Sequence, residues 1–484
     1  MSGTNNDLAY ISATEVARLI KKGEITSVEV TQLAIDRANA TQGTLNAFIT
    51  ICEDQAIDAA RSSDSAVSNG EKLGPLQGVP FTVKDLINTQ GVRTTMGSLI
   101  FDENFPKSDA VAISRLKEAG AILIGKTTTP EFGHKPFTSA PIFGDTTNAW
   151  SRHRIAGGSS GGAAVAAAAG LGYIHVGTDG GGSIRIPSAA NGIVGMKATL
   201  GTVPNDSNPD SFGNYSYTGP MTRTVSDAAL MLSIMSGPHP SDVHSVGRKQ
   251  KDYQGYISDP GDLEGFRIAW RPLLGNTIID TELLSITSKA VKSLESHGAK
   301  VIEVDDPFES PEPFWRIINQ SAWKARFGRY LSEWSSEMTP SFIRSIQEAE
   351  DYSATELQEA VYKRTTLFRE VQSWFNEFDL VVTPTLSRTA LEIDRDLYDP
   401  VMIEGEKAGI VRQAWYPYTH PFNLTGHPAI TLPSGFHSDG LPTAIQVIGP
   451  FASDHEVLRC ARLFEMCNPW SDRFPNIAMS TSPQ

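Results

Sequence analysis

Cysteine is scarce in this sequence, with Cys52, Cys460 and Cys467 the only three among 484 residues. So few cysteines, and an odd number of them, do not make the disulfide framework on which small secreted proteins depend. The first ten residues, MSGTNNDLAY, also lack the basic and apolar segments of a secretory signal peptide. We therefore expect reduced thiols and a cytoplasmic protein.

Basic residues are also in deficit: 41 Lys and Arg face 55 Asp and Glu, for a net charge of −14. This balance argues against a nucleic-acid partner and against an anionic membrane surface. Long hydrophobic runs are missing, because the least polar stretch, 161–177, is mostly alanine and glycine and is expected to form a buried helix and strand. With 40% hydrophobic residues the chain can still bury a sizeable core. We expect a globular monomer or homodimer.

Helical and strand-like patterns alternate along the chain. Residues 8–70 are expected to be helical, with Ser12 as the N-cap of the first helix. LQGVPFTVKD is expected to be a strand that ends at Lys84, and FRIAW and KVIEVDD flank a helix as in a β-α-β unit. This alternation predicts an α/β fold with a mixed sheet covered by helices on both faces.

GAILIGKT, residues 120–127, matches the phosphate-loop pattern G-x-x-x-x-G-K-[ST]. A phosphate loop needs a flexible turn between a strand and a helix, so that backbone N–H groups converge on the phosphate. Here the middle residues Ala-Ile-Leu-Ile favour a strand, and the following TTTPEFG is not helical. The order of elements is inverted, and a nucleotide-binding protein that uses this segment is the weaker alternative.

GGSSGG, residues 157–162, contains G-x-S-x-G twice, centred on Ser159 and Ser160. A serine-hydrolase elbow needs a strand before the serine and a helix after it. The alanine-rich helix is present, but the preceding NAWSRHRIA is polar and irregular. His420 and His427 lie in stretches flanked by proline and glycine and are interpreted as structural, not as the partner base. No motif indicates zinc, so we expect no metal and no cofactor.

GTDGGGSIRIP, residues 177–187, places three glycines before a serine and an arginine two positions later. Taken alone, this pattern fits a phosphate cradle, a tight turn, or a hole for an oxyanion beside a nucleophile. Together with Lys84 in FTVKD and Ser159 in GGSSGG, Ser183 in this stretch resembles the amidase signature family of serine hydrolases. The resemblance runs through most of residues 8–235 and returns in PFNLTGHPAITLP and GLPTAIQVIG. Gly180 departs from it, because the family often carries a larger residue there.

The resemblance implies a Ser–Ser–Lys triad. Ser183 would be the nucleophile, and Ser159, held by a cis peptide bond in the family, would relay its proton to Lys84. Lys84 must be neutral to accept that proton, so burial has to lower its pKa from the usual value. An intact lysine and two intact serines argue against a scaffold that has lost its chemistry.

The resemblance also gives the glycine triplet a role. Without side chains, these residues can turn successive N–H groups inward to meet the oxygen of a tetrahedral intermediate. The expected oxyanion hole consists of the N–H groups of Gly180, Gly181, Gly182 and Ser183.

Three nearby residues are expected to support this site. Asp179 and Arg185 should brace the loop as a buried ion pair, since buried charges usually pair. Ser160 either supports the triad through a hydrogen bond or caps the alanine-rich helix, and capping is the simpler interpretation.

Four aromatic residues recur at helical spacing over residues 323–334, namely Trp323, Phe327, Tyr330 and Trp334. A stripe of this kind is most simply helix core. The alternative is that Trp323 and Phe327 form one wall of an apolar pocket, with Phe132 of the PEFG loop as a second wall. That pocket would accept an aryl or bulky acyl group.

The domain boundaries follow from these segments. We expect one large domain with an N-terminal helical segment at 1–70, an amidase-signature core at 71–237, a variable and mostly helical insertion that shapes the substrate pocket at 238–410, and a C-terminal return to the sheet at 411–484.

The expected activity is hydrolysis of small carboxylic amides, with esters and carbamates as further substrates. The alternative within the family is the glutaminase subunit of a tRNA-dependent amidotransferase, which would need partner subunits and an exit for ammonia.

Overall fold

Eleven strands form one continuous sheet in the computed structural model, which describes residues 8–477. Its strands, in chain order, are β1 (Phe48–Ile51), β2 (Pro80–Lys84), β3 (Ile122–Thr127), β6 (Ile174–Asp179), β7 (Val194–Lys197), β8 (Tyr217–Thr222), β9 (Arg267–Trp270), β10 (Lys300–Glu303), β11 (Leu380–Pro384), β14 (Ala429–Phe436) and β15 (Pro442–Ile448). Two small ribbons pair β4 (Ser139–Ala140) with β5 (Gly144–Asp145) and β12 (Pro400–Ile403) with β13 (Glu406–Ile410).

The strand order is β1-β3-β2-β6-β8-β7-β14-β15-β11-β9-β10. The β3-β2-β6 and β11-β9-β10 segments are parallel, and the strands between β6 and β11 run antiparallel. The predicted mixed sheet of a single large α/β domain is therefore confirmed.

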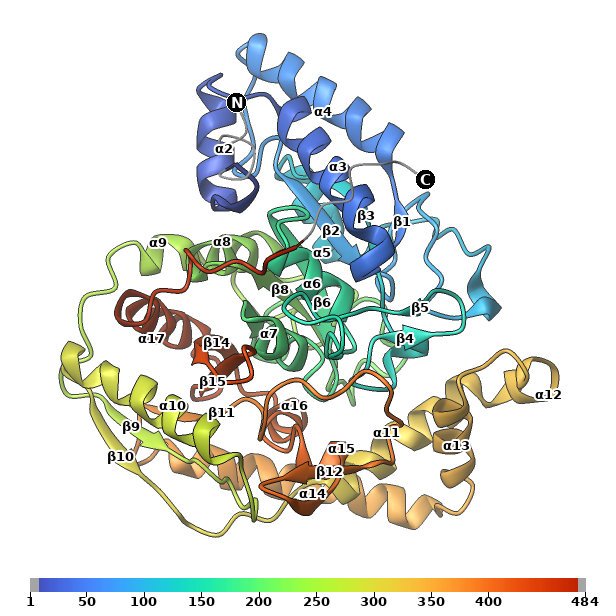
Figure 1. Cartoon of the computed structure of the whole chain (residues 1–484), viewed down its shortest axis with the longest axis vertical. Coiled ribbons are helices and arrows are strands. Elements are labelled where there is room, and N and C mark those ends of the chain that lie inside the picture. Colours follow the sequence, from blue (N-terminus) through green and yellow to red (C-terminus); the bar gives the residue numbers. More distant parts are fainter. Residues whose placement is uncertain (1–7, 478–484) are drawn as a thin grey trace.

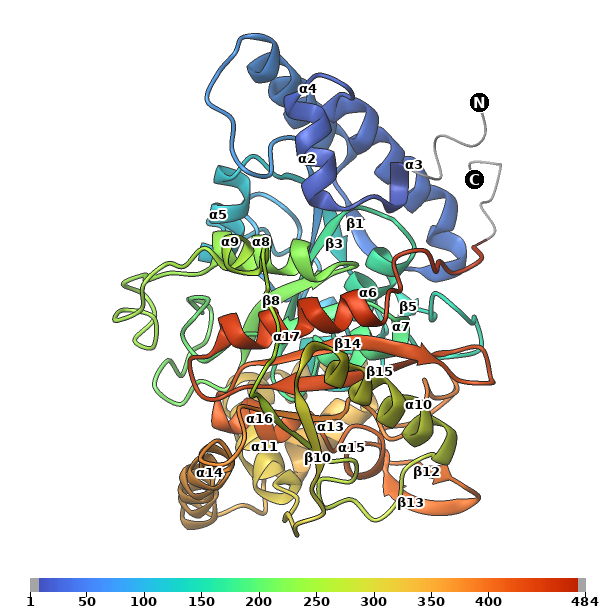
Figure 2. The same cartoon turned by 90° about the vertical axis from the view of Figure 1, so that its left-hand side faces the viewer.

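Helices cover both faces of this sheet (Figures 1 and 2). They are α2 (Ala13–Lys21), α3 (Ser27–Leu45), α4 (Glu53–Ser68), α5 (Val111–Glu118), α6 (Gly161–Ala168), α7 (Arg185–Asn191), α8 (Val225–Met235), α9 (Tyr253–Ile257), α10 (Thr281–Lys292), α11 (Glu312–Phe327), α12 (Leu331–Trp334), α13 (Pro340–Glu348), α14 (Ala354–Trp374), α15 (Val411–Ala414), α16 (His420–Thr425) and α17 (Asp454–Cys467). Within residues 8–477, no helix combines the length and apolar character needed to cross a membrane.

Alternation along the strands explains why both faces need cover. In β11, Leu380 and Val382 join a core cluster that includes α8 and α17, whereas Val381 joins a second cluster with α11 and α14. Successive side chains of a strand point to opposite faces, so an apolar run such as LVV must be buried on both.

The N-terminal segment differs from the expectation in one respect. Ser12 caps α2 as predicted, because its hydroxyl accepts the Glu15 N–H. Between α3 and α4, however, residues 48–51 form β1 and pair antiparallel with β3. A strand of four residues between two helices carries little periodicity of its own, and its β-branched residues are extended by pairing with the neighbouring strand.

Residues 238–410 contribute strands as well as helices. Their β-α-β unit is present as predicted, with parallel β9 and β10 around α10, and with β11 it adds three strands to the central sheet. The helix expected over 323–334 is interrupted: α11 ends at Phe327, Gly328–Tyr330 form a 3-10 turn, and α12 follows. Gly328 is a weak helix former, which accounts for the break.

Candidate active site

Strand β2 carries Lys84 into the interior. Phe81 and Val83 pack in the hydrophobic core, so Lys84, one residue further on, points to the opposite face of the strand. Its side chain is fully buried, and its Nζ donates to Ser159 Oγ at 2.6 Å and to Thr178 Oγ1 at 2.9 Å. The lysine and the first serine of the expected triad are therefore in direct contact.

Burial controls the protonation of Lys84. Desolvation lowers the pKa of Lys84 well below its ordinary value of 10.5, and only the charge of Asp179 opposes the shift. The neighbouring carboxylate of Asp85 faces away, where it accepts hydrogen bonds from the N–H and hydroxyl of Thr95. Burial thus shifts Lys84 toward the neutral amine, which a general base requires.

The glycines on either side of Ser159 pack closely against neighbouring residues. A Cβ at Gly158 would lie 2.8 Å from the backbone of Pro136, and one at Gly161 would lie 2.2 Å from the Thr138 hydroxyl. The peptide bond between Gly158 and Ser159 is cis, as the family resemblance implies. Small residues are needed here because any side chain would push Ser159 away from Lys84.

Ser183 follows the glycine triplet and lines the same cavity as Ser159. The backbone there needs glycine: Gly182 has φ +124, and a Cβ at Gly181 would lie 2.6 Å from the ring of Trp315. Among the described residues, no hydrogen bond joins the Ser183 and Ser159 hydroxyls. Catalytic hydrogen bonds are often longer in the free enzyme than in its substrate complex.

Hydrogen bonds fix the orientation of the glycine loop. Trp315 Nε1 donates to Gly180 O at 3.1 Å and Thr419 Oγ1 donates to Gly181 O at 2.7 Å. A trans peptide points its N–H opposite to its carbonyl, so the first of these bonds turns the Gly181 N–H away from Trp315.

One of the four expected oxyanion donors needs correction. The Gly182 N–H donates to Asp179 Oδ1 at 2.7 Å, and Gly182 does not line the cavity. Its donor is used to hold the loop, because the short turn brings it against the buried carboxylate. The N–H groups of Gly180, Gly181 and Ser183 have no acceptor among the described residues, and all three residues line the cavity.

Asp179 and Arg185 form the buried ion pair expected from the sequence. Arg185 Nε lies 3.0 Å from Asp179 Oδ2, and both side chains are fully buried. Burial alone would raise the pKa of Asp179, but Arg185 outweighs it and the pKa falls to about 2. The sequence did not indicate the next partners, Asn423 and Gln446, whose side-chain oxygens accept from Arg185 at 2.6 and 2.5 Å. They lie in PFNLTG and AIQVIG, the two C-terminal segments that share the family resemblance.

Ser160 stands at the N-cap position of α6, but its side chain makes no capping hydrogen bond, so the interpretation of its hydroxyl as a cap is wrong. Its hydroxyl donates to Thr178 O at 3.1 Å and accepts from Thr178 N at 3.3 Å, while its own N–H donates to Ser183 O. The side chain turns toward β6 and not toward the first turn of α6. Ser160 therefore holds together Ser183 and Thr178, and Thr178 is the second hydroxyl on Lys84, which no local sequence feature marked.

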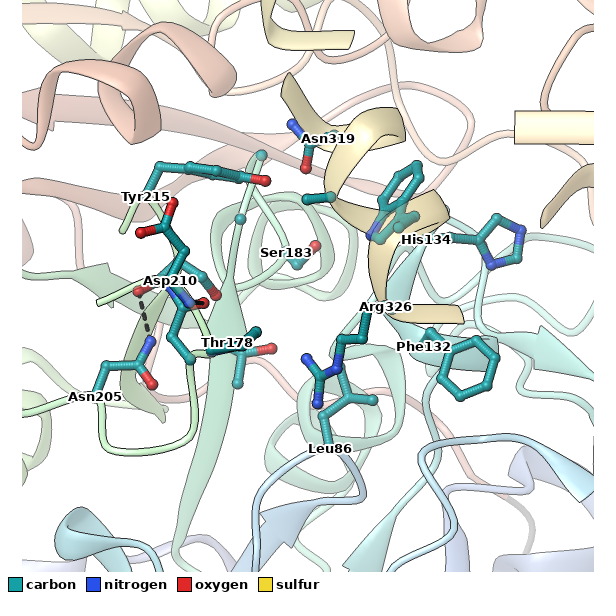
Figure 3. Close-up of a pocket in the computed structure, with 18 of the residues that line it drawn as sticks. Leu86, Phe132, His134, Thr178, Ser183, Asn205, Asp210, Tyr215, Asn319 and Arg326 are labelled. Carbon is teal, nitrogen blue, oxygen red and sulfur yellow. Dashed lines mark hydrogen bonds between the residues drawn. The ribbon is translucent and has the colours of Figure 1, made fainter. Parts of the chain in front are cut away.

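The cavity in front of these residues has a volume of about 780 Å³ (Figure 3). The expected pocket residues Phe132, Trp323 and Phe327 all line it, with the rings of Phe132 and Phe327 stacked at 3.9 Å between centroids. The same rings pack on Phe342 in a core cluster, which Tyr330 joins without lining the cavity. The aromatic stripe is therefore partly core and partly cavity wall.

His420 and His427 are buried and do not line the cavity. Burial lowers the pKa of each to about 3, so both rings are neutral. His420 packs against Trp315 and Tyr416, and His427 Nε2 lies 2.9 Å from Gln372 Oε1. These contacts agree with a structural role.

Lys126, the lysine of the phosphate-loop match, lies inside β3 and is fully buried. Its ammonium donates to Ile87 O, Thr89 Oγ1 and Thr94 Oγ1 at 2.5, 2.8 and 2.9 Å. An ammonium has three donors, so none is left for a phosphate, and the strand is followed by a short 3-10 turn instead of an α-helix. Lys126 fastens the 87–94 loop to the sheet.

Substituting Lys126 by methionine should lower the free energy of unfolding by about 3 kcal/mol, because three buried oxygens lose their donor. Thermal denaturation measures this loss, and Lys22→Met, which changes an exposed lysine, should shift the midpoint little. Calorimetry with ATP and magnesium should show no binding to either the parent protein or the Lys126 variant. Micromolar ATP binding that disappears in Lys126→Met would contradict the structural role.

Comparison with known proteins gives independent evidence of the family. Residues 29–458 match the family model described as Amidase. The chain is 36% identical over 476 residues to an acylamidase of Rhodococcus erythropolis, with 98% of each chain covered. It is 33% identical to the A subunit of the glutamyl-tRNA(Gln) amidotransferase of Moorella thermoacetica, with 98% and 100% covered. A solved bacterial aryl acylamidase of the amidase signature family superposes with a TM-score of 0.90 at 29% identity, over 96% of this chain and 97% of that one.

Proposed function

The chain belongs to the amidase signature family and is an amide-hydrolysing enzyme, and from that premise we propose that it works through an acyl-enzyme on Ser183. The observation that carries the proposal is the 2.6 Å hydrogen bond between Lys84 Nζ and Ser159 Oγ, in full burial and beside the cavity that Ser183 lines. A buried, neutral amine in contact with a hydroxyl is a ready proton acceptor.

In the proposed first step, Ser183 Oγ attacks the carbonyl carbon of the amide. Its proton passes to Ser159 Oγ, and the proton of Ser159 passes to Lys84 Nζ, which becomes an ammonium. The carbonyl oxygen takes the negative charge and accepts hydrogen bonds from the N–H groups of Gly180, Gly181 and Ser183. Each such donor typically contributes a few kcal/mol to the transition state.

Collapse of the tetrahedral intermediate completes the acylation. The Lys84 ammonium returns a proton through Ser159 to the nitrogen of the leaving amine, the C–N bond breaks, and the acyl group stays on Ser183. Water then attacks the ester by the same route and releases the acid. Thr178 Oγ1 accepts from Lys84 throughout and keeps the amine aimed at Ser159, which makes Thr178 a positioning residue.

The walls of the cavity support an aryl or bulky acyl substrate. Phe132, Phe327 and Trp323 offer aromatic surface, and Leu86 and Ile318 add apolar area. A volume of about 780 Å³ is ample for an aromatic amide. Esters and carbamates present the same acyl carbon to Ser183 and are proposed as further substrates.

Glutamine hydrolysis is the second candidate, because the amidotransferase relatives are similar to the chain over nearly its full length. The small polar side chain of glutamine would leave the aromatic walls unused. We therefore expect the aryl amide to be the better substrate.

The test uses the purified protein without nucleotide, added metal or partner protein. It should hydrolyse p-nitroacetanilide, phenyl acetate and a phenyl carbamate, and kcat/KM for the anilide should exceed that for glutamine at least about a hundredfold. Release of p-nitroaniline is followed by absorbance and release of ammonia by a coupled assay. Glutamine turnover equal to or faster than anilide turnover would favour the glutaminase instead.

A further inference from the structure

A cationic side chain enters the cavity from helix α11. Arg326 lies between the wall residues Trp323 and Phe327 and itself lines the cavity. Figure 3 shows its guanidinium turned into the open space, with Leu86 and Thr178 around it and Ser183 in the same cavity. The sequence pattern singled out the aromatic residues of this helix and indicated no role for Arg326.

The guanidinium of Arg326 has no partner among the described residues. No carboxylate lies within ion-pair distance, and no oxygen accepts a hydrogen bond from it. The Phe327 ring is its one cation–π partner among the described residues, with the ring centroid 5.0 Å from Cζ. The side chain of Arg326 is exposed to solvent in the free enzyme; partial desolvation lowers its pKa, and the only opposing charge interaction is with Tyr330. Five N–H donors on a permanent charge are therefore unused.

Four other charged residues line the cavity: Lys135, Asp206, Asp210 and Arg364. Asp206 and Asp210 accept backbone N–H groups at 3.3 and 2.9 Å in and beside their exposed loop. Arg364 donates to three backbone carbonyls. Lys135 makes no ion pair within the described residues either; burial lowers its pKa, and the charges of Asp145, Asp396 and Glu131 oppose that shift. Of the two arginines that line the cavity, Arg326 is the one without a hydrogen-bond or ion-pair partner among the described residues.

We propose that Arg326 binds a carboxylate of the substrate, so that the preferred substrates are aryl amides that carry a carboxylate away from the scissile bond. The inference rests on the proposed function and specifies its substrate class. A guanidinium meets a carboxylate through two parallel hydrogen bonds, and these are strong where water is partly excluded. The Phe132 and Phe327 rings would hold the aryl group of the substrate, and Arg326 would neutralise the charge of its carboxylate. Arg326 is thus a specificity-determining residue.

The experiment compares carboxylate substrates with neutral counterparts in which a carboxamide replaces the carboxylate. The pairs are built on acetanilides substituted at the meta or para position and on N-phenylsuccinamic acid, which places the charge on the acyl side. For at least one pair the parent enzyme should prefer the carboxylate by about ten- to a hundredfold in kcat/KM. Arg326→Gln should abolish that preference and Arg326→Lys should retain part of it.

The control is Arg329→Gln, which removes the same charge from an exposed residue that contacts Tyr330 and does not line the cavity. It should keep the preference of the parent enzyme. The ratio is measured within each variant, so a general loss of activity or folding cancels. No preference in any pair, or a preference that survives Arg326→Gln, overturns the inference while amide hydrolysis itself stands. If the parent enzyme hydrolysed none of these amides, the proposed function would be refuted instead.

Discussion

Replacing Ser183 by alanine is expected to lower kcat for an aryl amide about 10⁴-fold or more. The acyl-enzyme cannot form without this hydroxyl, and the remaining N–H donors can stabilise only direct attack by water. Steady-state and single-turnover kinetics on p-nitroacetanilide measure the loss.

Ser188→Ala is the matched control for this variant. Ser188 lies on α7, five positions after Ser183, and its buried hydroxyl has no partner among the described residues. The same chemical change there should leave kcat within about threefold, since it breaks no hydrogen bond. If Ser183→Ala kept a tenth of the parent rate while folding normally, the nucleophile would have to be another residue.

Replacing Lys84 by alanine is the second substitution with a large expected effect, a loss of several orders of magnitude in kcat. Within the described part of the chain, Lys84 is the only titratable side chain hydrogen-bonded to Ser159, and in the proposed mechanism the Ser183 proton has no acceptor without it. Because the triad acts as a unit, the double variant with Ser159→Ala should be far less impaired than the product of the two single losses. Multiplicative losses would mean that the two residues act independently.

The pH profile gives a second readout for Lys84. Only its neutral form accepts a proton, so activity should rise as the pH increases through its pKa. Burial lowers that pKa well below 10.5, and the acid limb should therefore lie well below that pH. Lys84→Ala should remove this limb from its residual activity. An acid limb that is the same with and without Lys84 would assign the proton to another group.

The triad residues were predicted from short motifs, through the family resemblance that these motifs carry. Lys84, Ser159 and Ser183 stand in FTVKD, GGSSGG and GTDGGGS. In the structure Ser159 and Ser183 line one cavity, and the buried Lys84 is hydrogen-bonded to Ser159. Glycine marks such positions because close packing and positive φ exclude other residues. The α/β class was equally visible, because strand and helix periods alternate along the chain.

Contacts between distant segments could not be predicted in this way. Asn423 and Gln446 reach Arg185 from the far end of the chain, and Trp315 reaches Gly180 from α11. No local pattern marks a hydrogen bond that only the tertiary fold creates. For the same reason, local patterns indicated β9 and β10 as strands of a β-α-β unit but did not show that they would join β11 and extend the central sheet.

Ser160 and Gly182 show a different limit. Both were interpreted from their place in a motif: Gly182 as an oxyanion donor, and Ser160 as a support of the triad or, more simply, a helix cap. The structure gives the Ser160 hydroxyl to Thr178 and the Gly182 N–H to Asp179. In a tight turn the direction of each donor depends on backbone dihedrals, which the residue type alone does not fix.

The most direct measurement of the central claim is the position of the covalent adduct after treatment with an aryl sulfonyl fluoride. The enzyme is digested and its peptides are analysed by mass spectrometry, in the parent protein and in Ser183→Ala and Lys84→Ala. We expect one adduct per chain on Ser183 in the parent enzyme, none in Ser183→Ala, and labelling at least about a hundredfold slower in Lys84→Ala. An adduct on Ser159 or Ser160, or unchanged labelling without Lys84, would contradict the proposed triad.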